Sequence, residues 1–370
     1  MQAKKAGPRF LFAVFIAVIC CPWIFWVFLQ GCVDTTNYEN RELQEAPEIC
    51  NFEDYTSFPR KFEAFFNDRI PFRNALVMLK GAADYYAFGT SPNQKVIIGK
   101  DGWLFFDHPA DGNPMAGYRG YTLTEEEVKA FAEHCIRQRN RLAEEGIDFV
   151  IFIAPNKARI YSDKMPDSIG PPAENYEVKQ IVNYLRENTD LKVFYPIEEL
   201  KRAREILPQD IYYKTDTHWN RIGGYVGTKV LLEALGINMP DWETGEVTVF
   251  EDGERTGDLA RLLGLFPGLQ RVNTEYTVGG YDTHEVESLG DFEYEYRFRA
   301  KGADPRKIFV IWDSFSESMR SYLASQFNES EFVYYPHYSH ALLEEQKPDI
   351  VIFEVVERYW RNISYFEADE

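Results

Sequence analysis

The sequence predicts an α/β protein in which helices cover both faces of a mostly parallel β-sheet, a three-layer α/β/α arrangement. Short, nearly continuous apolar runs of strand length recur along the chain, and segments with helical spacing of apolar residues separate them. Parallel strands that are buried on both faces have this pattern, because crossover helices cover the sheet on each side. The expected strands are residues 147–154, 191–195, 307–312 and 349–354.

The composition is that of a globular protein and excludes several other classes. Of the 370 residues, 45% are hydrophobic and 27% are charged, which excludes a disordered chain, collagen-like repeats and a polytopic membrane protein. The chain has 40 basic and 59 acidic residues, for a net charge of −19. A surface this acidic repels phosphate backbones, which argues against nucleic acids as partners.

One segment near the N-terminus departs from this average. Residues 10–29 carry no charge and have the length that spans the core of a bilayer. Lys4, Lys5 and Arg9 precede the segment, and such a basic flank stays in the cytoplasm. We therefore expect residues 1–32 to form a cytoplasmic tip and a transmembrane signal anchor, with the remaining chain outside the membrane.

Two alternatives to an uncleaved anchor stay open. A cleaved signal peptide has a shorter apolar region, usually about 7–15 residues. Residues 29–32, Leu-Gln-Gly-Cys, resemble a bacterial lipoprotein cleavage box, which would place a lipid on Cys32. All three alternatives put the body of the protein beyond the membrane, in an extracellular or periplasmic location.

The remaining chain is expected to contain a stalk and one folded domain. Residues 33–57 are polar and acidic and are assigned to the stalk, and residues 58–370 are assigned to the domain. Within the domain, residues 96–106 predict a β-hairpin with a Lys-Asp-Gly turn. Residues from about 243 to 299 are rich in glycine and tyrosine and predict β-hairpins inserted into the α/β body.

The signals for a helix start are strongest at Thr124. Thr124 and Glu127 have the spacing of a capping box, and the apolar residues that follow, Cys135 among them, form one buried stripe. Of the five cysteines, only Cys50 and Cys135 lie beyond the apolar segment and its edge, so they could pair, but they are too few for a disulfide framework. Because no cysteine or histidine spacing is typical of a zinc site, neither a metal nor a cofactor is expected.

Asp216 and His218 are the first candidates for chemistry. They lie in a turn just before a predicted helix, for which Asn220 is a good N-cap. A carboxylate two residues from an imidazole can accept a hydrogen bond from one ring nitrogen and leave the other free to act as a base. A capped loop with a solvated histidine would have the same sequence, and His337 is an alternative base.

Ser314 is the second candidate. It directly follows the expected strand 307–312 and precedes an expected helix over 317–326. The carboxyl ends of parallel strands meet at one edge of a sheet, where backbone N–H groups of the next turn can stabilise negative charge. A serine there becomes a nucleophile only with a base, which Asp216 and His218 would supply; otherwise Ser314 merely caps the helix.

At these residues the sequence resembles the alginate O-acetyltransferase family of AlgJ and AlgX, which has a circularly permuted SGNH hydrolase-like fold. The resemblance starts from Asp-Thr-His-Trp-Asn at 216–220, followed later by Asp-Ser-Phe-Ser at 313–316. The specific matches are the Asp-x-His-Trp block and the Gly-Trp-Leu-Phe-Phe block that ends the run at 99–106. Weaker matches run through most of the soluble chain, including Ala-Pro-Asn-Lys at 154–157 and Gly-Asp-Leu at 257–259. The order in which Asp-x-His precedes Ser is the permuted order of that family.

The resemblance implies that Asp216, His218 and Ser314 form a catalytic triad. Ser314 would accept an acetyl group as an ester and pass it to a hydroxyl of a cell-surface or secreted polysaccharide. The acetyl donor would be a membrane-bound O-acyltransferase partner of the MBOAT type. One departure from the family pattern is Trp312, which stands where the family has a glycine before Asp-Ser.

The oxyanion donors of ordinary SGNH enzymes have no recognisable motif here. The Ser314 N–H is the first candidate, and Asn156, Arg320 and Tyr322 are further candidates for oxyanion or substrate contacts. Three functions fit the sequence. They are a membrane-anchored extracytoplasmic polysaccharide O-acetyltransferase, a carbohydrate esterase with the same triad, and a non-catalytic polysaccharide-binding or scaffold protein, which the departure at Trp312 favours.

Overall fold

The computed structural model spans the whole chain and describes residues 7–32, 43–265, 273–281, 283–292 and 294–367. The chain divides into two compact units. One consists of Met1–Pro92 with Arg261–Gln270, and the other of Asn93–Ala260 with Arg271–Glu370. The predicted boundary between stalk and domain at residues 57 and 58 stays a prediction, and residues 33–42 of the predicted stalk lie outside the described residues.

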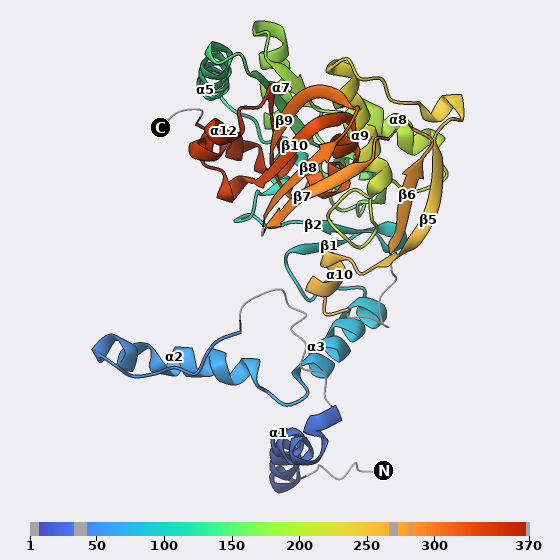
Figure 1. The fold of residues 1–370 in the computed structure, drawn as a ribbon. Helices are drawn as coiled ribbons and strands as arrows, with labels where there is room; N and C mark the ends of the chain where they lie inside the picture. Colours follow the sequence, from blue (N-terminus) through green and yellow to red (C-terminus); the bar gives the residue numbers. More distant parts are fainter. Residues whose placement is uncertain (1–6, 33–42, 266–272, 282, 293, 368–370) are drawn as a thin grey trace. The chain divides into compact units, whose positions relative to one another are not determined.

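The first unit is helical. α1 (Pro8–Leu29) contains the uncharged segment Phe10–Leu29, which is long and apolar enough to cross a membrane. α2 (Phe52–Asp68) and α3 (Arg73–Ala82) follow, and a π-helical turn over Ala83–Phe88 continues α3 (Figure 1). The predicted transmembrane segment therefore forms one continuous helix.

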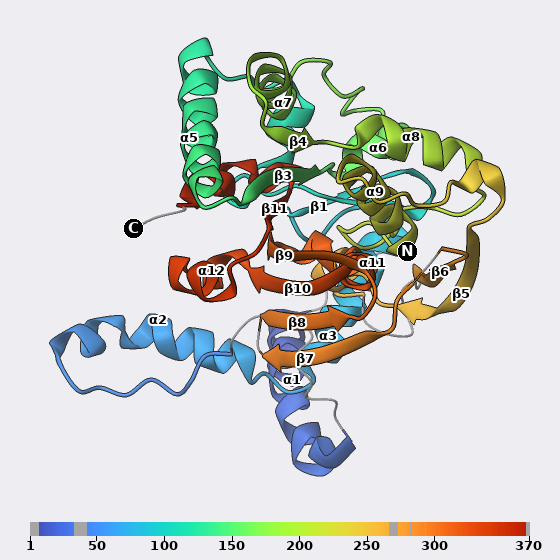
Figure 2. The ribbon, with the colours of Figure 1, turned by 45° about the horizontal axis from the view of Figure 1, so that its top comes forward.

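The second unit is built on a seven-stranded sheet with the order β4-β3-β11-β9-β10-β8-β7 (Figure 2). The first five strands in this order are parallel, and the last two are antiparallel to their neighbours. This mostly parallel sheet confirms the predicted fold class. The strands are β3 (Asp148–Ala154), β4 (Lys192–Phe194), β7 (Val286–Phe292), β8 (Glu295–Ala300), β9 (Asp304–Trp312), β10 (Phe327–Tyr334) and β11 (Ile350–Val356).

Helices cover both faces of this sheet, as the apolar runs predict. Successive residues of a strand point to opposite faces, so Ile308 and Val310 of β9 join one core while Phe309 and Ile311 join the other. Figure 2 shows α5 and α12 on one side of the strands, and α8 and α9 on the other. The helices of this region are α4 (Pro114–Tyr118), α5 (Glu125–Glu144), α6 (Lys157–Ile160), α7 (Glu177–Asn188), α8 (Ile197–Ile206), α9 (Arg221–Ala234), α10 (Asp258–Leu262), α11 (Arg320–Gln326) and α12 (His340–Gln346).

The predicted hairpin near the start of the second unit is confirmed. β1 (Val96–Ile98) and β2 (Leu104–Phe106) pair in an antiparallel ladder. Trp103 lies just before β2 and is only 1% exposed, and its ring stacks on that of Tyr161 with the centroids 4.0 Å apart. The aromatic residues of this block are therefore part of the core.

The region predicted to hold inserted hairpins is divided between two sheets. β5 (Thr248–Arg255) and β6 (Asn273–Gly279) form a separate antiparallel ribbon. β7 and β8 instead extend the central sheet, because β8 pairs with β10. Tyr296 and Phe298 of β8 pack against the core on one face, which ties this hairpin to the α/β body.

α5 begins with the predicted capping box. The Thr124 hydroxyl accepts a hydrogen bond from Glu127 N (3.2 Å), and the Glu127 carboxylate accepts one from Thr124 N (2.8 Å). Cys135 lies on the buried face of this helix, where burial raises the pKa of its thiol to about 12. Cys50 is exposed, and both cysteines are free thiols, so the pairing left open by the sequence is not made.

The capping box at Thr124 predicts a measurable loss of stability when its hydroxyl is removed. Thr124→Ala should lower the free energy of unfolding by about 1 kcal/mol, because Glu127 N loses its acceptor. Thr124→Ser keeps an acceptor at the same place and should stay near the parent value. Urea unfolding of the two variants compares them directly, and equal midpoints would contradict the role of the cap.

Candidate active site

The structure brings together the three side chains that the sequence singled out. His218 Nδ1 lies 2.7 Å from Asp216 Oδ1, and His218 Nε2 lies 2.8 Å from Ser314 Oγ. With Nδ1–H donating to the carboxylate, Nε2 is left to accept the hydroxyl proton of Ser314. The arrangement can remove a proton from Ser314 and stabilise the imidazolium that results.

Ser314 lies at the carboxyl edge of the sheet because β9 ends at Trp312. Asp313 then caps a 3-10 turn, Ser314–Ser318, by accepting a hydrogen bond from Phe315 N (2.8 Å). Its second carboxylate oxygen accepts one from Val356 N (2.7 Å) at the end of β11, which fixes the turn against the neighbouring strand. The predicted helix start at residue 317 is wrong, because this cap first imposes the 3-10 turn and α11 begins at Arg320.

A second buried carboxyl group supports the same turn from below. Glu354, on β11, accepts hydrogen bonds from the Ser316 hydroxyl (2.7 Å) and from Asp313 N (3.2 Å). Burial raises the pKa of Glu354 well above its usual value, and the nearby Asp313 charge adds to this rise. Burial also raises the pKa of Asp313, so two negative charges side by side are disfavoured beneath the Ser314 turn.

Trp312, the departure from the family pattern, does not disrupt this geometry. Its ring packs against those of Tyr296 and Tyr334, with centroids 5.8 and 5.3 Å apart, on the two adjacent strands β8 and β10. Its side chain is therefore buried in the core on one face of the sheet. The hydrogen bond between Ser314 and His218 forms immediately after it.

The loop that carries His218 is joined directly to the Ser314 turn. Asn220 caps α9 as predicted, accepting hydrogen bonds from Ile222 N (2.9 Å) and Gly223 N (3.2 Å). Trp219 Nε1 donates to the Phe315 carbonyl (2.8 Å). At Gly224 a Cβ atom would lie 2.5 Å from the Ser318 carbonyl oxygen, so the close approach of α9 to the 3-10 turn requires glycine.

A second carboxylate, Asp258, supports this loop. It accepts hydrogen bonds from Thr217 N (2.8 Å) and the Thr217 hydroxyl (2.6 Å), while its own N–H donates to Asp216 Oδ2 (3.1 Å). The preceding Gly257 allows the contact, because a Cβ there would lie 1.9 Å from the Thr215 carbonyl oxygen. Asp258 Oδ2 is 3.9 Å from His218 Nδ1, behind the closer Asp216.

Among the described residues, Asp216, His218 and Asp258 form a group whose ligand atoms lie within 4.8 Å of one another. Three such side chains could hold a metal ion. The same atoms are already engaged in hydrogen bonds to one another, to Thr217 and to Ser314. We therefore assign the group to hydrogen bonding.

The charges around the imidazole favour its protonated form. Burial would raise the pKa of Asp216, but the hydrogen bond from His218 and the charge of Arg255 hold it well below its ordinary range. Burial opposes protonation of His218, yet the bond to Asp216 outweighs it and raises the pKa of the imidazole above its usual 6.5. The carboxylate thus strengthens the base.

Lys157 holds the same loop from inside the protein. It is 4% exposed, and its ammonium donates to the carbonyls of Tyr213 (3.0 Å), Lys214 (3.2 Å) and Asp216 (2.6 Å). An ammonium has three N–H donors and a neutral amine only two, so the protonated form is needed to satisfy all three carbonyls. Burial lowers the pKa of Lys157 to about 7, while Asp258 and Asp216 oppose that change.

The further candidates for oxyanion or substrate contacts lie in different places. Asn156 lines a small cavity together with Thr217 and Arg358, and Arg358 Nη1 donates to its side-chain oxygen (3.3 Å). The Arg320 guanidinium lies 3.8 Å from the centre of the Tyr296 ring.

Two other sequence candidates are engaged away from Ser314. Tyr322 is buried, and its hydroxyl donates to the Arg221 carbonyl (3.0 Å), so it serves the packing of α9. His337 stacks on Tyr294, with the ring centroids 4.7 Å apart, whereas His218 holds the place beside Ser314.

Sequence reasoning missed the parts that Lys157 and Asp258 play in positioning the loop. Both positions fall in the weaker family-like blocks at 154–157 and 257–259, which was the one signal that could have pointed to them. Their spacing from His218 in the sequence carries no information, because Lys157 begins α6 and Asp258 begins α10, and both reach the loop only in the folded protein.

Comparison with known proteins identifies relatives of this chain. Residues 96–329 match the family model described as an SGNH hydrolase-like domain, acetyltransferase AlgX. A probable alginate O-acetylase AlgJ of Azotobacter vinelandii is 29% identical over 216 residues, which cover 56% of this chain and 51% of that protein. The chain thus spans about half the length of this relative.

Two solved structures show a similar fold. PatB1 of Bacillus cereus, in a structure with a sulfonyl adduct, superposes with a TM-score of 0.50 at 16% identity, covering 71% of this chain and 96% of that one. A DHHW family protein from Eubacterium siraeum gives a TM-score of 0.52 at 12% identity, covering 74% and 99%. At these identities the likeness concerns the fold alone.

The contacts of Lys157 predict that its ammonium stabilises the loop that carries His218. Lys157→Met should lower the free energy of unfolding by about 3 kcal/mol, because the Tyr213 and Asp216 carbonyls lose their buried hydrogen bonds to the ammonium. The Lys214 carbonyl keeps the hydrogen bond from Leu104 N (2.8 Å). Amide hydrogen exchange in residues 213–218 should become faster at the same time.

Lys214→Met is the matched control in the same loop. The Lys214 side chain is half exposed and pairs with Asp210 at 3.4 Å, a surface ion pair that contributes less than about 1 kcal/mol. Urea unfolding and exchange measured by mass spectrometry compare the two variants. Equal effects of the two substitutions would contradict the role given to Lys157.

Proposed function

The chain belongs to the AlgX family of SGNH hydrolase-like acetyltransferase domains, and on that premise we propose that it acetylates hydroxyl groups of a polysaccharide through an acetyl ester on Ser314. The observation that carries this proposal is the continuous hydrogen-bonded chain from Asp216 through His218 to Ser314 at the carboxyl edge of the sheet. An acyl-transfer site needs one nucleophile, one base and one orienting acid in this order.

In the proposed first half-reaction, Ser314 Oγ attacks the carbonyl carbon of the acetyl donor while His218 Nε2 takes the hydroxyl proton. The bond from the acetyl carbon to the donor's leaving group then breaks, and His218 returns the proton to that leaving group. The product is an acetyl ester on Ser314. Asp216 stabilises the imidazolium throughout, because its carboxylate is held ionised.

In the second half-reaction, a sugar hydroxyl gives its proton to His218 Nε2 and attacks the ester carbonyl. The bond between the acetyl carbon and Ser314 Oγ breaks, and Ser314 recovers its proton from His218. Negative charge develops on the carbonyl oxygen in both steps. We assign its stabilisation to the Ser314 N–H and to the side-chain NH₂ of Asn156, whose oxygen already accepts from Arg358.

The location and partners belong to the same proposal. α1 would anchor the chain with the second unit outside the cytoplasmic membrane, since its basic flank precedes the apolar segment. The acetyl donor would be a membrane-bound O-acyltransferase. The polysaccharide acceptor is supported by the relative named as an alginate O-acetylase.

Hydrolysis of acetyl esters is the second candidate function, in which water replaces the sugar hydroxyl. The observation in its favour is that the His218 side chain is 20% exposed, so water can reach the base. The chemistry at Ser314 is the same in both functions. The fate of the acetyl group therefore distinguishes them.

Acetylation of Ser314 is the first test of the proposed function. Intact-mass spectrometry of the purified chain incubated with an activated acetyl ester should show one acetyl adduct, mapped to Ser314, that Ser314→Ala abolishes. Ser318→Ala, in the same 3-10 turn but without a bond to His218, should keep the adduct. Absence of both adduct and acetate release from the parent chain would contradict catalysis, and faster release of acetate than transfer to a sugar would favour the esterase.

The electrostatics of His218 predict how acetylation depends on pH. The base acts in its neutral form, so the rate should rise with pH and reach half its maximum above pH 6.5, because Asp216 raises the pKa of His218. Asp216→Asn removes that interaction and leaves the opposing effect of burial, so the midpoint should move to lower pH while the maximum rate falls. Time courses of adduct formation, quenched at intervals and repeated between about pH 5 and 9, measure the midpoint and the maximum rate. An unchanged midpoint in Asp216→Asn would contradict the pairing.

A further inference from the structure

α2 has one aromatic face and one polar face. At 100° per residue, its six aromatic residues fall within an arc of about 140° on the helix surface, and its charged residues occupy the remainder. The aromatic residues are Phe52, Tyr55, Phe58, Phe62, Phe65 and Phe66. The charged residues are Glu53, Asp54, Arg60, Lys61, Glu63 and Asp68.

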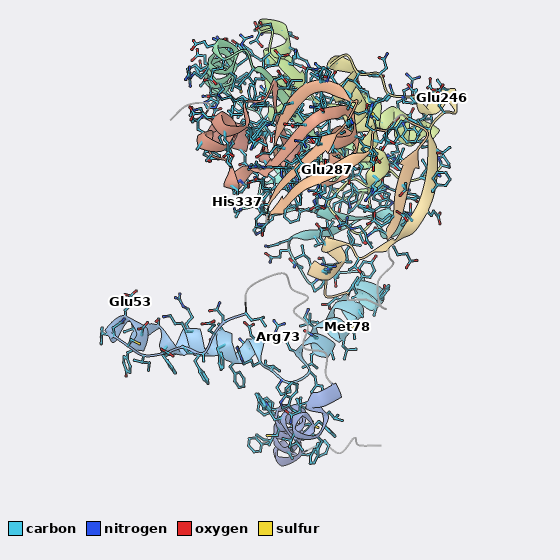
Figure 3. The ribbon with its side chains drawn as sticks, in the orientation of Figure 1. Glu53, Arg73, Met78, Glu246, Glu287 and His337 are labelled. Carbon is cyan, nitrogen blue, oxygen red and sulfur yellow. The ribbon has the colours of Figure 1, made fainter. Side chains whose placement is uncertain are left out.

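The described residues leave most of this aromatic face uncovered. None of the residues of α2 is buried, and Phe52, Tyr55, Phe62 and Phe66 are exposed by 80, 64, 45 and 41%. Figure 3 draws the side chains along α2, which begins near the labelled Glu53. Soluble surfaces seldom present such a contiguous apolar patch unless it binds something.

The helix also needs an apolar surface for its own stability. Most of the stability of a helix in a protein comes from packing of its apolar face rather than from intrinsic propensity, and Pro59 inside α2 removes one backbone hydrogen bond. Contacts within the helix, such as the stacked rings of Phe58 and Phe62 (5.7 Å between centroids), join its own residues only. The free energy that stabilises α2 must therefore come from burial of its aromatic face against another apolar surface.

The contacts between the C-terminal end of α2 and α1 indicate where α2 lies relative to the membrane. The Phe66 ring stacks on Trp23 of α1, with centroids 5.4 Å apart, and Phe72, just beyond α2, meets Trp26 edge-on at 6.1 Å. Trp23 and Trp26 lie in the last two turns of the apolar helix. Tryptophans at the ends of spanning helices lie among the lipid headgroups, so α2 meets α1 at the height of the membrane interface.

We propose that α2 lies along the outer surface of the membrane with its aromatic face inserted among the lipids. This inference rests on the proposed insertion of α1 in the membrane. The polar face carries four acidic and two basic residues, so insertion depends on apolar burial rather than on attraction to anionic lipid. The membrane attachment then consists of one spanning helix and one surface helix.

Site-specific photocrosslinking of the full chain in phosphatidylcholine nanodiscs tests this proposal. p-Benzoylphenylalanine at position 62 lies on the aromatic face, and the same probe at position 60, two residues earlier, lies on the polar face as the matched control. After irradiation, mass spectrometry should find at least tenfold more phospholipid adduct at position 62. The yield should persist when salt is raised to about 1 M, where charge attraction is screened.

Three results would overturn the proposal: equal lipid adducts at positions 60 and 62, no lipid adduct at position 62, or adducts at position 62 only with a second copy of the chain. Carbonate extraction of the parent chain from membranes separately tests the insertion of α1. A chain that resists extraction but gives no lipid adduct at position 62 refutes the placement of α2 and leaves the proposed anchoring intact. A chain released by carbonate refutes the anchoring itself.

Discussion

Three hydrogen bonds from the Lys157 ammonium join the end of β3 to the loop that precedes His218. The ammonium donates to the Tyr213 and Asp216 carbonyls in buried hydrogen bonds, and it shares the Lys214 carbonyl with Leu104 N, so it helps to hold the backbone of this loop in its shape. The same shape brings Asp216 and His218 into line with Ser314, which arrives from a different strand. The geometry of the proposed triad thus depends on a residue that makes no contact with the serine.

Buried carboxyl groups also shape the turn that carries Ser314. Two carboxyl groups, Asp313 and Glu354, lie buried beside the Ser314 turn, and burial raises the pKa of both, which disfavours two charges together. The two carboxylate oxygens of Asp313 accept hydrogen bonds from backbone N–H groups of two different segments, which fixes the position of the turn. The chain has a net charge of −19. At the proposed active site the negative charge of Asp216, which lies beside His218, is balanced by Arg255 and by the imidazole itself.

Much of this structure could be predicted because the relevant signals are local. Strands β3, β9 and β11 are continuous apolar runs, and the Thr124 cap and Asn220 cap follow from side chains within three residues of the backbone groups they bind. The 3-10 turn after Ser314 was missed because Asp313, which caps it through Phe315 N, is itself fixed by Val356 N at the end of the adjacent strand β11. The extension of the sheet by β7 and β8 was missed for the same reason, since pairing of β8 with β10 is a long-range event.

The sequence by itself determined the fold class, the apolar N-terminal helix and the identities of Asp216, His218 and Ser314 as candidates, because periodicity, hydropathy and motif spacing are properties of neighbouring residues. Only the tertiary structure decided that these three side chains meet, that Trp312 turns away into the core, and that Lys157 and Asp258 hold the loop. Parallel strands align their carboxyl ends through hydrogen bonds between segments that are far apart in the chain, so the contacts made at that edge exist only after the sheet has formed.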